Sequence, residues 1–418
     1  MSELAIALFW TLFSLAVIMA VPAVRFALSL YQARPQMVDD NQLPPAAVVL
    51  CVRGADPFLR DCISGLIHQD YPHYCICIIV DSHDDPAWGL IKDLVGEDQI
   101  PHLRVETLKH KYETCSLKCS ALIQAVSGLE EQWQAIAMID GDVITHPTWL
   151  RELVTPLLNA RVGAATGQRW YVPQDGQWGS IFRYLWNAAA VVNMSIHQFP
   201  WAGSLVMSRS LLQQTKMLDM WRYGISDDAP VERAVRKLGL IVQLVPTLMM
   251  VNYEACSLSS CMNFVTRQLL ATRLYQNWVV VVMPVMLTTI PFILTAILLI
   301  KALVLQDFVS SVWLASGLLA YVTTLIGLMV LLDLAVRRVV HLRGEQMPHL
   351  PLRVIPQILV AIPFTQIGYA IATLMATFMR RMQWRGIIYE INGPWKIQRL
   401  NYFPFQYFQS AKNSNTSI

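Results

Sequence analysis

The chain has 418 residues, of which 55% are hydrophobic and 15% charged, and its formal net charge is +3 at pH 7. This composition is too apolar for one soluble domain and predicts that part of the chain lies in lipid. The small net charge, without a Lys/Arg-rich block, argues against nucleic acid as a partner. The eight cysteines form no C-x-x-C pair, which argues against a zinc ribbon or a disulfide framework.

Residues 1–34 are predicted to be an N-terminal transmembrane anchor. Residues 4–28 are an apolar run that exceeds the roughly 20 residues needed to cross a bilayer. Glu3 precedes the run, Arg25 lies near its end and Arg34 follows it. Because positively charged residues stay on the cytoplasmic side, we expect an uncleaved anchor with its N-terminus outside and a cytoplasmic domain after it.

Residues 44–255 are predicted to form an α/β domain, because short apolar runs alternate there with helical patterns. Ligands of such domains bind beyond the C-terminal ends of the strands, where Asp81 and Asp140 fall. The candidate strands are 46–52, 74–81, 103–108, 135–140 and 240–245, and the candidate helices are 57–68, 87–95, 115–127, 148–158 and 230–237.

The domain is organised around Asp140-Gly141-Asp142, which directly follows a buried strand. Two carboxylates one residue apart at such a place repel each other unless a positive charge lies between them. A Mg²⁺ or Mn²⁺ ion that holds a diphosphate is one such charge, because these ions prefer hard oxygen ligands. Gly141 would let the ligand approach the backbone. A plain Asp-Gly turn is the alternative.

Residues 256–277 mix apolar residues with Arg267 and Arg273, and they are predicted to form an amphipathic helix at the membrane interface. Residues 278–380 then form a C-terminal transmembrane region. Its apolar runs are 278–300, 309–336 and 354–379. Several arginines follow the second of these runs, which places that loop in the cytoplasm.

The last apolar run, 354–379, conflicts with the charge rule if it crosses the membrane once. The tail that follows, 381–418, is rich in Lys and Arg and would then lie outside the cell. Pro356 and Pro363 interrupt the run. We therefore expect a re-entrant hairpin there.

Five motifs occur in a fixed order along the chain. They are DSHDDPAW at 81–88, DGD at 140–142, GSLVMSRSLL at 203–212, SDDAPVERAVRKLGL at 226–240 and WRGIIYEI at 384–391. With them the sequence resembles the family-2 glycosyltransferases and, among these, the ceramide glucosyltransferase-like branch. The resemblance implies a multi-pass membrane protein in which an α/β GT-A-like nucleotide-sugar domain is inserted between transmembrane helices, and an inverting reaction.

The resemblance also implies roles for single residues. It assigns the general base to Asp228, with Asp227 beside it, although both also suit a helix start after Ser226. It assigns a divalent cation, Mn²⁺ or Mg²⁺, to Asp140 and Asp142. The donor-binding residues that it implies are Asp81, Asp84, Asp85, Lys118, Asp140, Arg267 and Arg273, and the acceptor-side residues are Trp201, Gly203 and Ser204. A solvated helix position is the alternative for Lys118, and a packed turn is the alternative for the acceptor-side group.

The interfacial segment departs from the family pattern. Members carry an Arg-Trp pair after a leading Arg or Gln, whereas Leu270 and Ala271 stand at the pair's positions after Arg267. Either Arg267 and Arg273 take over the phosphate contacts, or the site closes differently. The tail residues Trp384-Arg385-Gly386 could fold back and supply the missing cation and aromatic face, or they could anchor the tail at the interface.

These observations predict a membrane-embedded hexosyltransferase that makes a glycolipid. It would move a sugar from a nucleotide-diphosphate donor, expected to be a UDP-sugar, to a lipid hydroxyl such as that of a ceramide-like acceptor. An interfacial helix beside the site would let a lipid present its head group without leaving the bilayer. A processive polysaccharide synthase and a non-catalytic GT-A membrane protein are the alternatives. The catalytic domain is expected to face the cytoplasm.

Overall fold

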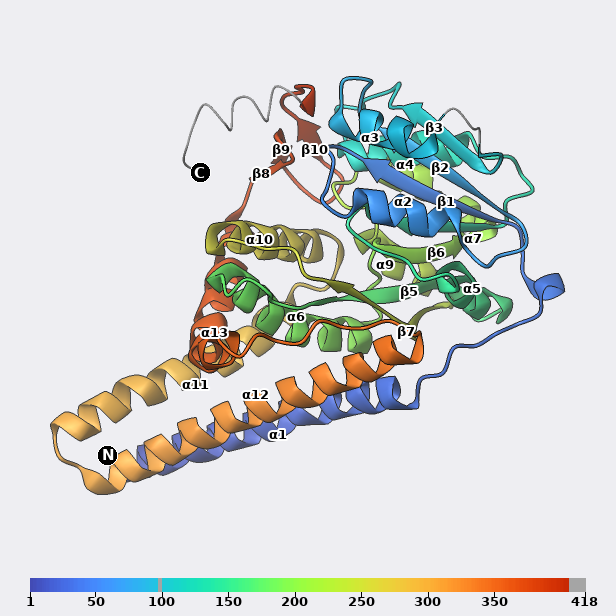
Figure 1. Cartoon of the computed structure of the whole chain (residues 1–418). Coiled ribbons are helices and arrows are strands. Elements are labelled where there is room, and N and C mark those ends of the chain that lie inside the picture. The colour runs from blue at the N-terminus through green and yellow to red at the C-terminus, as the bar shows by residue number, and fades with distance from the viewer. Residues whose placement is uncertain (97–99, 406–418) are drawn as a thin grey trace.

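A seven-stranded sheet forms the centre of the domain that follows the first long apolar helix (Figure 1). The computed structural model describes residues 1–96 and 100–405, so the end of the predicted tail, 406–418, lies outside the described residues. The strand order is β3-β2-β1-β4-β6-β5-β7, and of the strands described in this sheet only β6 runs against the others. The strands are β1 Ala46–Val52, β2 Tyr74–Val80, β3 Leu103–Thr107, β4 Ala135–Ile139, β5 Val162–Tyr171, β6 Ser204–Ser208 and β7 Ile241–Asn252.

Four predicted strands are confirmed as β1 to β4, and the fifth is the first half of the longer β7. No predicted strand corresponds to β5 or β6. In β5 the reason is its run of small residues, which have weak strand propensity. A Cβ atom at Gly167 would lie 2.7 Å from the Leu248 carbonyl oxygen and 2.8 Å from Ser204 Oγ. Close approach of the β7 backbone and of the Ser204 side chain therefore requires glycine at position 167.

Helices cover both faces of the sheet and build two cores. Val48 and Leu50 of β1 pack with α2, α3 and α5, whereas Ala47 and Val49 pack with α4 and α9. The predicted helices correspond to α2, α3, α4, α5 with η2, and α9, and the predicted α/β GT-A-like fold class is confirmed. The helices are η1 Asp40–Gln42, α2 Leu59–Ile67, α3 Pro86–Val95, α4 Leu117–Ser127, α5 Trp149–Val154, η2 Thr155–Leu158, α6 Trp178–His197, α7 Arg209–Gln214, α8 Met217–Trp221 and α9 Ala229–Lys237.

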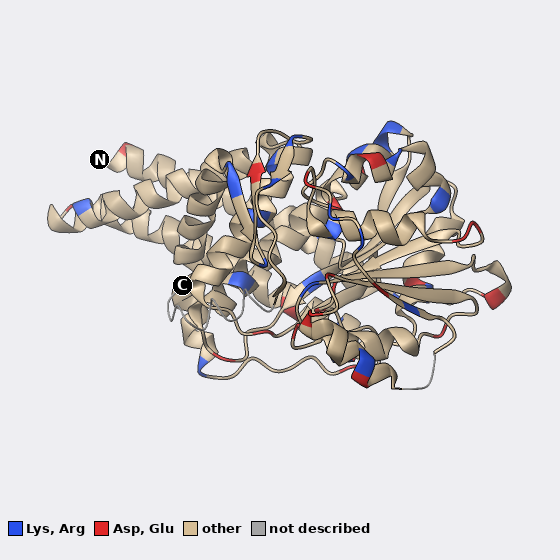
Figure 2. Ribbon diagram, turned by 90° about the horizontal axis from the view of Figure 1, so that it is seen from above, with Lys and Arg blue, Asp and Glu red and all other residues tan. Residues whose placement is uncertain are grey.

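Within the described residues, four helices are long and apolar enough to cross a membrane: α1 Ser2–Gln32, α11 Val279–Val304, α12 Phe308–Leu342 and α13 Val354–Phe378. The helices α1, α11 and α12 project together from the α/β domain, and they carry few charged residues (Figures 1 and 2). Gly317 of α12 lets α1 come close, because a Cβ atom there would lie 3.1 Å from Phe9 Cα. The buried carboxylate of Asp333 joins α12 to α6 by accepting a hydrogen bond from the Tyr184 hydroxyl at 2.9 Å.

The helix α13 is continuous, so the predicted re-entrant hairpin is wrong. Its prolines do not break it, because one lies in the first turn and Pro363 removes a single hydrogen bond. Both of its ends contact the rest of the protein on the side of the α/β domain. Before the helix, Gln174 Nε2 donates to the His349 carbonyl oxygen at 3.2 Å. Near its end, Arg273 of α10 (Leu258–Tyr275) donates to the Ala376 carbonyl oxygen at 2.7 Å.

The chain after α13 folds back onto the α/β domain as a three-stranded antiparallel sheet (Figure 1). Its strands are β8 Arg381–Trp384, β9 Ile387–Ile391 and β10 Ile397–Arg399. The buried Tyr389 hydroxyl accepts a hydrogen bond from the Leu117 N–H at 3.1 Å, and the Arg399 N–H donates to the Glu113 carbonyl oxygen at 2.7 Å. These contacts fix the tail sheet beside the start of α4.

Candidate active site

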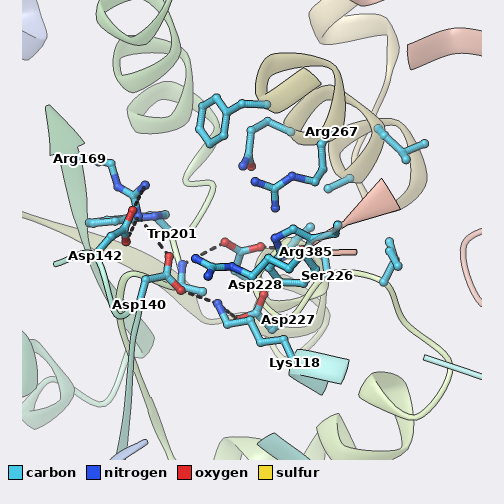
Figure 3. A pocket seen from close by; sticks show the side chains of 18 of the residues that line it. Lys118, Asp140, Asp142, Arg169, Trp201, Ser226, Asp227, Asp228, Arg267 and Arg385 are labelled. Carbon is cyan, nitrogen blue, oxygen red and sulfur yellow. Dashed lines mark hydrogen bonds and ion pairs between the residues drawn. The ribbon is translucent and has the colours of Figure 1, made fainter. Parts of the chain in front are cut away.

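A cleft of about 720 Å³ lies beyond the C-terminal ends of β1, β2 and β4. Its walls come from those strand ends, from the starts of α4 and α9, from α6 and α10, and from the tail sheet. The predicted acidic residues that line it are Asp81, Asp140, Asp142, Asp227 and Asp228. Carboxylates from three distant parts of the sequence therefore meet in one cavity, most of them visible in Figure 3.

Arg169 of β5 holds the two carboxylates that follow β4. Its guanidinium lies 3.2 Å from Asp140 Oδ2 and 2.9 Å from Asp142 Oδ2, and it stacks over the Trp201 ring at 4.6 Å (Figure 3). Burial raises the pKa of Asp142, and the guanidinium opposes this rise. Sequence analysis did not single out Arg169. A charged side chain among the small residues of β5 is the signal that could have revealed it.

Lys118 of α4 bridges acidic residues from two sides of the cleft. Its Nζ lies 2.6 Å from Asp140 Oδ1 and 2.8 Å from Asp227 Oδ2. Burial alone would raise the pKa of Asp140, but Lys118 and Arg169 hold that pKa below its usual value. Burial raises the pKa of Asp227 to about 6, against the effect of Lys118. The predicted donor-side lysine is thus a partly buried member of the charge network rather than a solvated helix residue.

Asp228 stands at the N-terminus of α9 with a well-defined orientation. Its Oδ2 accepts a hydrogen bond from the Ala202 N–H at 2.9 Å, and its Oδ1 accepts one from the Ser226 hydroxyl at 2.7 Å. The first turn of α9 is capped by Ser226 instead, whose Oγ accepts from the Ala229 N–H at 3.3 Å. The Asp228 carboxylate is therefore free of helix capping, and it is partly exposed in the cleft.

Of the three acidic residues predicted after β2, only Asp81 lines the cleft. Its Oδ2 accepts hydrogen bonds from Arg53 and, at 3.2 Å, from the Tyr402 hydroxyl of the tail. Burial raises its pKa. Asp85 instead caps α3, because it accepts from the Ala87 N–H at 2.9 Å, and Asp84 is exposed. The structure therefore places Asp84 and Asp85 outside the donor site that the sequence predicts.

The residues predicted on the acceptor side have two different roles: one lines the cleft, and the others support the wall of the cleft. Trp201 and Ala202 line the cleft, whereas Ser204 is buried and accepts a hydrogen bond from the Trp149 indole N–H at 2.9 Å. Gly203 acts through its missing side chain, since a Cβ atom there would lie 2.0 Å from the Trp201 ring. Gly203 thus permits the orientation in which Trp201 stacks on the Arg169 guanidinium.

The two predicted arginines of α10 have different surroundings. Arg267 lines the cleft, whereas Arg273 donates to backbone carbonyl oxygens at the end of α13, including that of Met379 at 2.9 Å. Arg273 therefore caps a helix and does not reach a donor in the cleft. Trp384 and Arg385 of the tail line the cleft beside Arg267, as one of the two sequence-based alternatives for these residues requires.

The predicted cation site is compatible with the carboxylates after β4. No group of three or more His, Cys, Asp or Glu side chains arranged for a metal ion occurs within residues 1–96 and 100–405. Mg²⁺ in phosphate-transfer sites is usually held by one or two carboxylates together with substrate phosphates. Asp140 and Asp142 lie close enough to share the Arg169 guanidinium, so they can supply such a pair.

Comparison with known families and proteins identifies the class of this site. The family model described as glycosyl transferase family 21 matches residues 12–396, which include the whole cleft. The chain belongs to glycosyl transferase family 21. It is therefore a glycosyltransferase. A curated relative, the ceramide glucosyltransferase of Gibberella zeae, is 26% identical over 169 residues. That match covers 38% of this chain and 32% of the relative, so it spans about a third of the relative's length.

Solved structures with similar folds include two other glycosyltransferases. The mannosyltransferase PcManGT from Pyrobaculum calidifontis, in complex with GDP-Man and Mn²⁺, is 12% identical, with coverage of 87% of this chain and 99% of that chain and a TM-score of 0.46. The glucosyl-3-phosphoglycerate synthase from Mycobacterium tuberculosis, in complex with Mn²⁺, UDP and glucosyl-3-phosphoglycerate, is 16% identical. That match covers 57% of this family 21 chain and 85% of the synthase, with a TM-score of 0.38.

Proposed function

We propose that this family 21 enzyme moves a hexose from a nucleotide-diphosphate donor, in the first instance a UDP-sugar, to the hydroxyl of a membrane lipid. The observation that carries the proposal is the composition of a single cleft. It contains a pair of carboxylates, Asp140 and Asp142, suited to a divalent cation and a diphosphate. It also contains a separate carboxylate, Asp228, which forms no ion pair with a Lys or Arg side chain among the described residues. A leaving-group site and a candidate base thus lie side by side.

The lipid acceptor is supported by the apolar end of the cleft. Trp186 of α6, Phe264 of α10, Val281 of α11 and Tyr369 of α13 line that end. Val281 belongs to the first turn of a candidate membrane span. The cleft is therefore continuous from the carboxylates to helices that would lie at or in the bilayer. A ceramide-like acceptor could keep its chains among these side chains while its hydroxyl reaches Asp228.

The chemistry follows from the charges in the cleft. Asp228 would take the proton of the attacking hydroxyl, and a positioned carboxylate base contributes about 10²–10⁴-fold to such a step. Attack on the face opposite the leaving group inverts the sugar carbon. A divalent cation held by Asp140 and Asp142 would neutralise charge that develops on the leaving diphosphate. Lys118 keeps the Asp140 carboxylate ionised and oriented. The buried Asp81 is suited to hold the nucleoside end of the donor.

The arrangement of α13 supports a specific membrane topology. Because both ends of α13 contact the protein on the side of the α/β domain, we infer that α1, α11 and α12 cross the membrane and that α13 does not. The basic loop after α12 and the basic tail then lie on the same side as the catalytic domain, which the charge rule makes cytoplasmic. A tag after Ile418 should be protected from protease that is added outside intact cells. Cleavage of this tag from outside would contradict the topology.

The function is tested with purified full-length protein in nanodiscs that contain ceramide and phospholipids. The protein is incubated with labelled UDP-hexoses and GDP-mannose in the presence of Mn²⁺ or Mg²⁺. We expect label in the lipid extract, and at least about 100-fold less of it per unit time when Asp228→Asn replaces the wild type. Label in an insoluble polymer would instead favour the polysaccharide synthase. Absence of label in every fraction, from protein that still unfolds cooperatively, would contradict the proposal.

A further inference from the structure

The turn between β8 and β9 places an arginine in an unusual backbone conformation. Trp384 pairs with Ile387, so Arg385 and Gly386 form a two-residue hairpin loop. Both have positive φ angles, +46° and +81°, as a type I′ turn requires. The first position of that turn favours Asn, Asp or Gly, because a larger side chain in the left-handed region costs free energy. Such strain persists where surrounding contacts hold it, and it often marks a ligand site.

Contacts of the guanidinium show what holds this turn. Arg385 Nη2 donates to both carboxylate oxygens of Asp56, at 2.8 and 2.6 Å, and its Nη1 donates to the Arg53 carbonyl oxygen at 2.6 Å. These bonds direct the side chain into the cleft that Asp140 and Asp228 line (Figure 3). The turn therefore delivers a cation to the active site, from a part of the chain that follows the last long helix.

Arg267 of α10 lies in the same region but lacks a counter-ion. Lys118 and Arg169 each contact carboxylates, and Arg385 is paired with Asp56. Arg267 has no hydrogen bond or ion pair with any residue in the described ranges. Its guanidinium is instead stacked at 5.0 Å from the Trp384 ring.

The electrostatic surroundings of Arg267 indicate a missing anion. Burial, followed by repulsion from Arg385, lowers the pKa of Arg267 to about 10. A partly buried guanidinium beside another cation is unfavourable unless an anion binds between them. Guanidinium groups match phosphate oxygens with parallel hydrogen bonds, which makes phosphate the best-suited ligand class. A lipid phosphate and a donor diphosphate share this chemistry. The divalent cation that Asp140 and Asp142 could hold nearby would favour the diphosphate, because such a cation is usually shared between carboxylates and substrate phosphates.

We propose that Arg267 and Arg385, positioned by Trp384, bind the diphosphate of the sugar donor, so that the C-terminal tail completes the active site. This assignment rests on the proposed function for the identity of the donor. It also accounts for Leu270 and Ala271, which stand where the resemblance leads one to expect an Arg-Trp pair. In this chain the tail supplies both the aromatic ring and the second cation beside Arg267.

The test uses inorganic pyrophosphate as the probe, without added divalent cations, on full-length protein in detergent. Calorimetry should show that wild type binds pyrophosphate. Arg267→Met and Arg385→Met should each weaken binding by about 10- to 100-fold, because each removes charge-assisted hydrogen bonds. Arg381→Met is the matched control, since Arg381 belongs to the same hairpin and is mostly exposed, and it should bind as wild type does. Equal pyrophosphate affinity in all four proteins, or no binding by wild type, would overturn the proposal.

Thermal unfolding of Arg267→Met and one further variant, Arg385→Lys, separate binding from folding. Arg267→Met loses no hydrogen bond and relieves repulsion from Arg385, so its unfolding temperature should equal or exceed that of wild type while pyrophosphate binding falls. Arg385→Lys retains the charge and should keep part of the affinity. A lower unfolding temperature of Arg267→Met would show that Arg267 is structural and would overturn its assignment. Normal pyrophosphate binding without sugar transfer from any donor would contradict the proposed function and leave this site intact. If phosphatidic acid in micelles competed for the site but UDP did not, the lipid-phosphate assignment would replace the donor assignment.

Discussion

Replacement of Asp228 by Asn changes one atom of the carboxylate and removes its ability to accept a proton. The two hydrogen bonds of Asp228 can both survive. The amide oxygen can accept from the Ala202 N–H, and the amide nitrogen can donate to Ser226 Oγ, because a hydroxyl serves either role. We therefore expect the free energy of unfolding to change by no more than about 1 kcal/mol. The cleft should keep its shape.

The expected loss of activity is much larger than this structural cost. A general base contributes about 10²–10⁴-fold, which corresponds to about 3–5 kcal/mol of transition-state stabilisation. The lost group acts on the acceptor proton and makes no described contact with the donor-side carboxylates. Hence kcat should fall by that factor while the dissociation constant for UDP stays at the wild-type value.

The assay measures initial rates of transfer to lipid together with UDP binding to the same preparation. Asp219→Asn is the matched control, because Asp219 is an exposed carboxylate of the same domain, and its kcat should equal that of wild type. Transfer by Asp228→Asn at the wild-type rate would refute the assignment of the base. A parallel loss of UDP binding and of transfer would show that Asp228 positions the donor instead.

Three further predictions concern the surrounding charges. Burial raises the pKa of Asp227 from 3.8 to about 6, so the ionised carboxylate destabilises the folded state. As the pH rises from 3.8 to about 6, the unfolding free energy of wild type should therefore fall by about 3 kcal/mol compared with that of Asp227→Asn. Thermal unfolding of both proteins across this range checks the sign, and a pH-independent difference would contradict it. Asp140→Ala combined with Asp142→Ala should abolish the stimulation of UDP binding by Mn²⁺, and retained stimulation would place the cation elsewhere. Arg273→Ala should lower the free energy of unfolding by about 2 kcal/mol, because the C-terminal cap of α13 is lost, while kcat per folded molecule stays unchanged. A fall in kcat without a loss of stability would show that Arg273 acts in the active site.

The sequence-based predictions for the α/β domain rested on the periodicity of hydrophobic residues and on the acidic residues that follow the predicted strands. The strand before Asp140 is a short, fully buried apolar run, and such runs are recognisable without any knowledge of their neighbours. Asp84 and Asp85 show the limit of this reasoning. They belong to the same motif as Asp81, yet one is exposed and the other caps α3, because the direction of a side chain after a strand depends on the turn that follows.

By itself, the sequence determined which segments are apolar enough for a membrane, where strands and helices alternate, and which carboxylates follow strand ends. Each of these properties depends on neighbouring residues. Only the tertiary structure decided which cations meet those carboxylates. Arg385 pairs with Asp56 across 329 positions, and Arg169 reaches Asp140 from β5, a strand that the hydrophobic pattern did not predict. Such contacts depend on how the tail and the sheet pack, and packing between distant segments leaves no periodic trace in the sequence.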